Sequence, residues 1–200
     1  MSARSGRARR WQGVAGCIVA STLWFWPASV HGEDQAPAAP PTPKAAEALK
    51  LLGSNDAYER QLGFLRLEAL REPATLEAIS RYLNSKDPEL RAYSLRAVAA
   101  IQGPASVPLL LERLKAEKHT RVRRAALLAL EPFIATDPRI LPVCIAALRD
   151  PLTEIRMAAV DIVSRVDDPR AKDAIRERHR KEGRRDVRRV LKMAMRRIGE

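Results

Sequence analysis

Residues 154–166 read EIRMAAVDIVSRV, and the pattern of this segment recurs along most of the chain. Apolar residues follow its first arginine at offsets of 2, 3, 6, 7 and 10, as Ala158, Ala159, Ile162, Val163 and Val166. Because an α-helix turns once every 3.6 residues, these side chains share one face of a helix. The segment therefore predicts an amphipathic helix that buries this face.

The arginine of this pattern returns with a period near 32 residues, at Arg60, Arg91, Arg123, Arg156 and Arg188. We call these the repeat arginines. Prolines recur with a similar period, at Pro73, Pro104, Pro138 and Pro169. Two features with one period indicate a structural repeat. Since proline is tolerated in the first turn of a helix, each unit is predicted to hold two helices, one led by proline and one bearing the arginine.

Composition supports an all-α fold. Alanine, leucine and arginine, which favour helices, are abundant, and aromatic residues make up only 4% of the chain. The third residue after the repeat arginine is small in the first four units, at Gly63, Ser94, Ala126 and Ala159. Small side chains at this position allow neighbouring helices to approach closely.

The segments Asp87-Pro88-Glu89-Leu90-Arg91-Ala92 and Glu154-Ile155-Arg156-Met157-Ala158-Ala159 resemble the HEAT repeat family. The likeness is to the short bacterial form found in phycobilisome-lyase-like HEAT proteins, and it covers residues 44–200. It implies a right-handed α-α solenoid of about five helical hairpins. It also implies that the arginine-bearing helices line a concave face, and that the five repeat arginines are structural. The last unit departs most from the pattern, with Arg184-Arg185-Asp186 in place of an acidic-proline turn.

The first 32 residues have the layout of a secretory signal peptide. Four arginines lie among the first ten residues, an uncharged and mostly apolar run spans 13–30, and Glu33 begins a polar stretch. We expect cleavage after Gly32 and export across the inner membrane to the periplasm, with no transmembrane segment left. The alternative is an uncleaved anchor that tethers the protein to the membrane, because the run is at the short limit for spanning a bilayer.

Residues 33–43 form a proline-rich linker, and 44–200 are the predicted solenoid. Residues 33–169 carry 19 basic and 19 acidic residues, whereas residues 170–200 carry 13 basic and 5 acidic ones. The net charge of the folded part therefore lies in its last repeat.

One stripe of each arginine-bearing helix is predicted to stay outside the core. Arginine and methionine, which are enriched at interfaces, recur on it. We expect an unidentified protein to bind this concave stripe at Leu65, Arg96, Arg124, Leu128, Met157, Asp161, Arg189, Met193 and Arg196. The function predicted is that of a non-catalytic scaffold or adaptor of the cell envelope. The alternative for the stripe is an ordinary solvated surface.

The basic last repeat suggests a second function, that of a peripheral envelope protein on anionic lipid or polysaccharide. The residues predicted for this patch are Arg176, Arg178, Arg180, Lys181, Arg184, Arg185 and Arg197. A solubilising cap is the other interpretation. Export and the lack of aromatic residues for base stacking argue against nucleic acid.

Catalysis finds little support in the sequence. After residue 32 the histidines are His119 and His179, in different repeats, and no metal, nucleophile or phosphate-loop motif is present. Cys144 lies in an apolar run, which predicts a buried side chain rather than a reactive thiol. We therefore expect no enzymatic activity, no metal and no cofactor. A bilin-lyase role, implied only by the repeat subtype, conflicts with a signal peptide.

Overall fold

The computed structural model describes residues 39–199. The predicted signal peptide or anchor (1–32) and residues 33–38 of the linker lie outside this range. The first helix begins at Pro43, one residue before the predicted start of the solenoid. Thr42 caps it, because its side-chain oxygen accepts a hydrogen bond from the backbone N–H of Ala45 at 3.3 Å.

The described chain is helical, with no strand between residues 39 and 199. Its α-helices are α1 (Pro43–Leu52), α2 (Ala57–Leu70), α3 (Leu76–Ser80), α4 (Pro88–Gln102), α5 (Val107–Ala116), α6 (Thr120–Leu130), α7 (Ile140–Ala147), α8 (Thr153–Val163), α9 (Pro169–Lys181) and α10 (Arg185–Arg197). Short 3₁₀ turns occupy Pro73–Thr75, Arg81–Asn84, Gly103–Ser106 and Glu131–Phe133.

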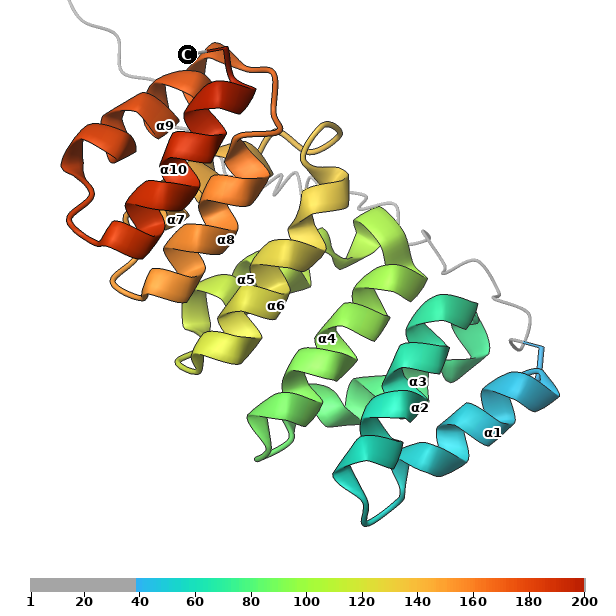
Figure 1. Cartoon of the computed structure of the whole chain (residues 1–200). Helices are drawn as coiled ribbons and strands as arrows, with labels where there is room; N and C mark the ends of the chain where they lie inside the picture. Colours follow the sequence, from blue (N-terminus) through green and yellow to red (C-terminus); the bar gives the residue numbers. More distant parts are fainter. Residues whose placement is uncertain (1–38, 200) are drawn as a thin grey trace, which may run out of the picture. The chain divides into compact units, whose positions relative to one another are not determined.

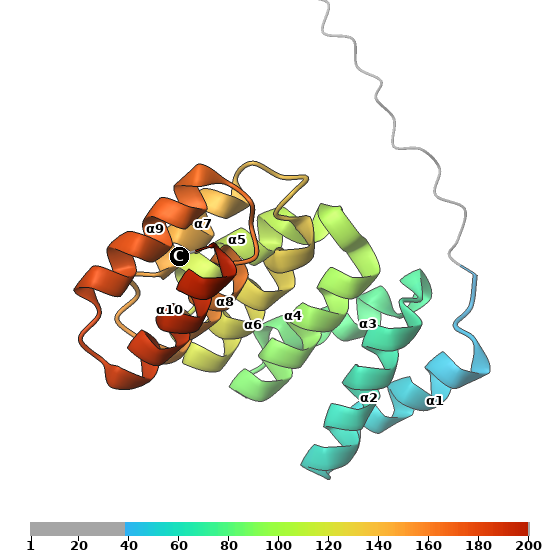
Figure 2. The ribbon, with the colours of Figure 1, turned by 45° about the horizontal axis from the view of Figure 1, so that its top comes forward.

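The helices form two layers (Figure 1). Helices α2, α4, α6, α8 and α10 each carry one repeat arginine, and each packs against the next in the series. We call them the arginine layer. Helices α1, α3, α5, α7 and α9 form the other layer, and Figure 2 shows them on one side of the arginine layer. The prediction of an all-α solenoid built from five helical hairpins is confirmed.

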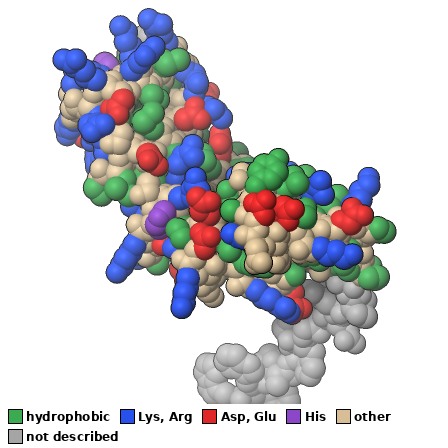
Figure 3. All heavy atoms as spheres, turned by 60° about the horizontal axis from the view of Figure 1, so that its bottom comes forward, with side chains coloured by type: hydrophobic (Ala, Val, Ile, Leu, Met, Phe, Trp, Pro, Cys, Tyr) green, Lys and Arg blue, Asp and Glu red, His purple; other side chains and the backbone are tan. Residues whose placement is uncertain are grey.

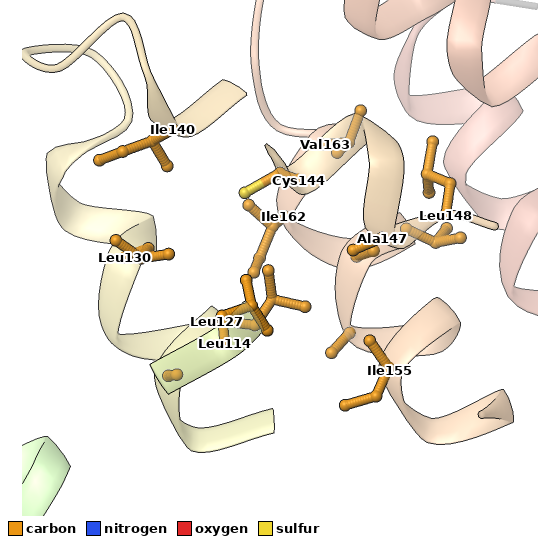
Figure 4. Packing of buried hydrophobic residues seen from close by; sticks show 14 of the residues in the cluster. Leu114, Leu127, Leu130, Ile140, Cys144, Ala147, Leu148, Ile155, Ile162 and Val163 are labelled. Atoms are coloured by element: carbon orange, nitrogen blue, oxygen red, sulfur yellow. The ribbon is translucent and has the colours of Figure 1, made fainter. Parts of the chain in front are cut away.

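The apolar face predicted from residues 154–166 is buried. Ala159 and Val163 are fully buried, and Ile162 is 1% exposed. Figure 4 shows Ile162, Val163 and Cys144 among the side chains that fill the space between α6, α7 and α8. Burial raises the pKa of the Cys144 thiol to about 12, so this side chain acts as a small apolar group.

Small residues bring adjacent helices together at the third position after the repeat arginine. Ser94, Ala126 and Ala159 are fully buried there. A methyl group added at Gly63 would lie 2.9 Å from the carbonyl oxygen of Ala48. The absence of a side chain at residue 63 therefore permits α1 and α2 to pack at their observed separation.

One helical run in the described part, Pro88–Ala116, has the length and apolar composition of a membrane span. In the fold this run is α4, a 3₁₀ turn and α5, and the turn begins at Gly103, whose φ of 58° departs from the helical value. Leu95 and Leu110, from its two halves, are buried in the solenoid core. The run is therefore a segment of the repeat stack.

Candidate protein-binding surface

The repeat arginines connect consecutive repeats. Three of them bind a carboxylate that lies 26 or 27 residues further along the chain. We call these three ion pairs, which lie at the boundaries between repeats, the junction pairs: Arg91–Glu117, Arg123–Asp150 and Arg156–Glu182.

Most repeat arginines also bind a backbone carbonyl six residues earlier. The acceptors, each at 2.8 Å, are the carbonyls of Ser54 for Arg60, Ser85 for Arg91, Asp150 for Arg156 and Glu182 for Arg188. Asp150 and Glu182 therefore contact two repeat arginines each. Their carboxylates bind the arginine of the preceding repeat, and their carbonyls bind the arginine of their own repeat.

The acids of the junction pairs were not identified from the sequence, although their spacing was visible. Each stands six residues before a repeat arginine, at Glu117, Asp150 and Glu182. In the first two repeats serine takes this position, at Ser54 and Ser85. Arg60 consequently has no carboxylate to bind in the second repeat, and its buried Nε has no hydrogen-bond partner among the described residues.

Two of the junction acids, Glu117 and Glu182, are held in their charged form. Burial acts to raise the pKa of Glu182, but the backbone N–H of Arg184 and the side chains of Arg178 and Arg156 outweigh it, and the pKa lies below its ordinary value. Glu117 behaves in the same way. Burial raises its pKa, hydrogen bonds from Arg91 and from the backbone of His119 lower it, and the net direction is downward. Both acids thus stabilise the fold as carboxylates.

The apolar residues of the predicted concave stripe do not form one continuous patch. Leu65 is 40% exposed and Met193 is 62% exposed, and they lie at opposite ends of the arginine layer. Leu128 and Met157, between them, are half-buried and pack against the core. Their contribution to a contact surface is therefore smaller than that of fully exposed side chains.

Ion pairs connect neighbouring helices across this stripe. Arg96 on α4 binds Glu68 on α2 at 2.9 Å, and Arg165 after α8 binds Glu131 after α6 at 2.8 Å. Asp161 on α8 binds Arg165 and also Arg197, the latter at 3.4 Å. Three other predicted residues are exposed and have no ion pair among residues 39–199: Arg124, Arg189 and Arg196.

Most residues of the predicted anion-binding patch form ion pairs with acids of the last repeat or of α8. Figure 3 shows basic side chains crowding this end of the molecule. Five of the seven predicted residues nevertheless form ion pairs: Arg176 with Asp173, Arg178 with Glu182, Lys181 with Glu177, Arg184 with Asp186, and Arg197 with Asp161. Arg180 and Arg185 are exposed, and no ion pair holds them within the described chain.

A cleft of about 290 Å³ opens across three consecutive helices of the arginine layer, at the C-terminal ends of α2, α4 and α6. We call it the three-helix cleft. Two residues of the predicted stripe, Arg96 and Leu128, line it. The other lining residues are not among the nine predicted to bind the partner, and they are Glu68, Arg71, Ala99, Ala100, Gly103, Ala129, Pro132 and Phe133. The lining is mainly apolar, with charged groups at Glu68, Arg71 and Arg96.

Within residues 39–199, no group of three or more histidine, cysteine, aspartate or glutamate side chains is placed to hold a metal ion.

Comparison with known proteins defines the class of this fold. A family model described as HEAT repeats matches residues 45–131, which run from α1 to the end of α6. This part of the chain is similar to HEAT repeats, and the predicted resemblance is confirmed over these residues. The same arrangement of hairpins continues through α10. No curated protein matches the sequence of the chain.

Solved structures show the same architecture. One is the complex of CpcE and CpcF of phycocyanin lyase from Nostoc sp. PCC7120, with a TM-score of 0.61 and 20% sequence identity over 75% of this chain and 96% of the matched chain. Another is a designed armadillo repeat protein in complex with the peptide (KR)4, with a TM-score of 0.52 and 13% identity over 78% of this chain and 82% of that one. At these identities the likeness concerns the fold alone.

Proposed function

We propose that this protein is a non-catalytic adaptor of the cell envelope that binds a partner protein at the three-helix cleft. HEAT and armadillo-type folds are typical of protein-interaction scaffolds. Of the similar structures, one contains CpcE together with CpcF and the other contains a bound peptide. The observation that carries the proposal is the cleft itself, an apolar recess with charged groups at its edge.

The cleft suits a short piece of polypeptide. Its volume of about 290 Å³ is at the lower limit for pockets that take drug-sized molecules. Ala99, Ala100 and Ala129 give it small side chains, and Leu128 and Phe133 supply apolar surface. An apolar side chain of the partner therefore enters, while Arg71, which is exposed and has no ion pair among the described residues, donates to carbonyls of the partner backbone.

The ion pairs of the last repeat argue against attachment through the seven residues predicted to bind anionic lipid or polysaccharide. Most of the basic residues predicted for that role bind acids of their own repeat or of α8. The exposed cation Arg124, by contrast, lies on α6 in the same layer as the cleft and has no ion pair within residues 39–199. A partner carboxylate can therefore bind Arg124 without breaking an existing contact.

The cleft is tested with a substitution that fills it. Ala100 lies in the lining and is half-buried, so Ala100→Trp places a large side chain in the recess. Ala57→Trp is the matched control, because Ala57 is exposed at the start of α2 and outside the cleft. The full chain and both variants are used to capture proteins from a solubilised envelope extract, and the captured protein is then purified for direct titration.

The proposal requires one protein that binds the wild-type chain and the Ala57→Trp variant equally, and that binds Ala100→Trp at least about tenfold more weakly. Equal binding to both tryptophan variants would exclude the cleft. Binding that disappears with added salt in all three proteins would instead favour a charged surface.

Export is tested separately. All three tryptophans of the chain, Trp11, Trp24 and Trp26, lie in the predicted signal peptide. A processed protein recovered from the periplasm therefore has no tryptophan emission, and its mass corresponds to a chain that begins at Glu33. Tryptophan emission from the recovered protein would show that the leader is retained and would support the membrane-tethered alternative.

A further inference from the structure

Four cations form a straight row along α10. They are Arg185, Arg189, Lys192 and Arg196, spaced four, three and four residues apart, and we call them the α10 row. With a rise of 1.5 Å per residue, the row extends about 16 Å along the helix. All four are exposed, and no ion pair to any of them is found in the described chain. The opposite face of α10 is buried, through Val187, Leu191 and Ala194.

In α4, and in part in α8, the positions that correspond to the row are buried against neighbouring helices, whereas in α6 the corresponding Arg124 is exposed. In α4 the positions one, four and eight residues after the repeat arginine are Ala92, Leu95 and Ala99, which are buried in the core cluster shared with the later helices. The same register in α8 gives Val160, which is fully buried, and Ser164, whose hydroxyl accepts a hydrogen bond from Arg197 of α10 at 2.8 Å. In α10 the same three positions are occupied by cations of the row, Arg189, Lys192 and Arg196. No described helix covers them.

A repeat face that no helix covers needs polar residues, but it does not need a single sign of charge. Like charges three or four residues apart destabilise a helix, and a cation in the first turn opposes the helix dipole. Elsewhere on the arginine layer the signs are mixed, as in Arg96 with Glu68. The like charges of the α10 row therefore repel one another, and an anionic partner would relieve this repulsion.

We propose that the α10 row binds an acidic α-helix of a partner protein, which packs on α10 as the next repeat would. A helix with glutamates spaced four, three and four residues apart presents a matching straight stripe of carboxylates. Met193 is 62% exposed, on α10 between Lys192 and Arg196, and it gives this helix an apolar contact. A second copy of the chain does not supply the stripe, because none of the described helices carries three acidic residues.

This site differs from the three-helix cleft, which is built from α2, α4 and α6. The two proposals are therefore independent, and different substitutions test them. Ala100→Trp is expected to leave binding at α10 unchanged, and substitutions in the α10 row are expected to leave binding at the cleft unchanged.

The experiment uses the full chain and two fluorescent peptides of identical composition. In the stripe peptide, four glutamates in an alanine-rich helix are spaced four, three and four residues apart, and in the scattered peptide they are distributed around the helix. Fluorescence anisotropy measures both affinities. We expect the stripe peptide to bind at least about tenfold more tightly than the scattered peptide, since the two differ only in charge complementarity.

Charge reversal identifies the residues involved. Arg189→Glu combined with Arg196→Glu should lower the affinity for the stripe peptide by at least about tenfold. A peptide with lysines in the stripe should then bind this variant. The matched control is Arg66→Glu with Lys118→Glu, which makes the same change in net charge at exposed positions outside α10 and should have little effect. Circular dichroism checks that both variants remain helical.

Vesicles containing phosphatidylglycerol provide the competing outcome. Equal affinity for the two peptides, tighter binding to the vesicles than to the stripe peptide, or the absence of peptide binding would each overturn the proposal. The same holds if the lysine peptide fails to bind the charge-reversed chain.

Discussion

Arg156 and Glu182 join two consecutive repeats through an ion pair that is almost completely enclosed. Nε of Arg156 lies 3.0 Å from Oε2 of Glu182, and the two side chains are 9% and 2% exposed. The guanidinium also donates to the carbonyls of Asp150 and Pro151, at 2.8 and 3.0 Å. Since a buried charge is destabilising when its partner is removed, this pair is the most sensitive of the junctions.

Replacing the repeat arginine is therefore expected to have an effect that depends on the repeat. Arg156→Ala should lower the free energy of unfolding by about 3 kcal/mol, since it leaves the Glu182 carboxylate enclosed with Arg178 as its remaining basic partner. Arg60→Ala should lower it by about 1 kcal/mol, because Arg60 donates to the carbonyl of Ser54 and to no carboxylate of the described residues. Urea denaturation measures both values, and equal losses would show that the carboxylate contact contributes nothing.

Supplying the missing acid should stabilise the first junction. Ser85→Glu places a carboxylate where later repeats have one, and it gives the buried Nε of Arg60 an acceptor. Glu117 shows that glutamate at this position also accepts the backbone N–H two residues later, at 3.0 Å, as Ser85 does for Asp87.

We expect Ser85→Glu to raise the free energy of unfolding by about 1 kcal/mol, and the melting temperature by about 3 °C. In an Arg60→Ala background the same substitution should give no gain. A gain that persists without Arg60 would mean that the new side chain acts elsewhere.

Glu117 and Glu182, two of the junction acids, predict the response of stability to pH. The pKa values of Glu117 and Glu182 are lower in the folded chain than their ordinary value, so the unfolded chain binds more protons as the pH falls. Their stabilisation is complete above the ordinary glutamate pKa of about 4.3, and it is lost as the pH falls through that value toward the lower folded pKa values.

Glu182→Gln should accordingly be less stable at neutral pH, and its melting temperature should fall less steeply than that of the wild type between about pH 5 and pH 3. Glu112→Gln is the control, since Glu112 is exposed and forms no ion pair among the described residues. Parallel curves for wild type and Glu182→Gln would contradict this assignment.

Gly63 should tolerate no larger side chain without loss of stability. In Gly63→Ala the new methyl group would lie 2.9 Å from the carbonyl oxygen of Ala48 and 2.9 Å from Cδ2 of Leu52, so α1 must move away from α2. We expect a loss of about 1–3 kcal/mol in the free energy of unfolding, even though alanine favours helix more than glycine does. At Gly53 the nearest atom to an added methyl group is 3.6 Å away, and Gly53→Ala should leave the denaturation midpoint unchanged.

The fold was predictable because its determinants are local and repeated. The apolar offsets after each repeat arginine, the periodic prolines and the small residues such as Gly63 each reflect one unit, and each feature recurs in at least four units. The predicted start of the helical part, residue 44, is one residue too late. Helix α1 begins at Pro43, because proline fits its first turn and Thr42 caps it.

The candidate site is harder to predict from the sequence than the fold, because it depends on contacts between repeats. Helical periodicity places Leu128 and Met157 on the same stripe as Leu65, but neighbouring helices half-bury them and leave Leu65 exposed. Likewise, counting charges in the last repeat does not show that Arg178 binds Glu182 while Arg185 stays exposed. The three-helix cleft combines Arg71, Ala100 and Phe133, from three different repeats, and no single-repeat pattern relates them.

The double use of the acids at 150 and 182 makes the unit that begins at Asp150 modular. This unit contains a carboxylate that binds the arginine of the unit before it, and an arginine that binds the carboxylate of the unit after it. A duplicated copy of residues 150–181 would therefore contain both groups that connect it to its neighbours, the carboxylate of Asp150 and the guanidinium of Arg156. Lengthening the chain inside the stack needs no new interaction, whereas adding a unit beyond α10 would place an apolar helix against four cations.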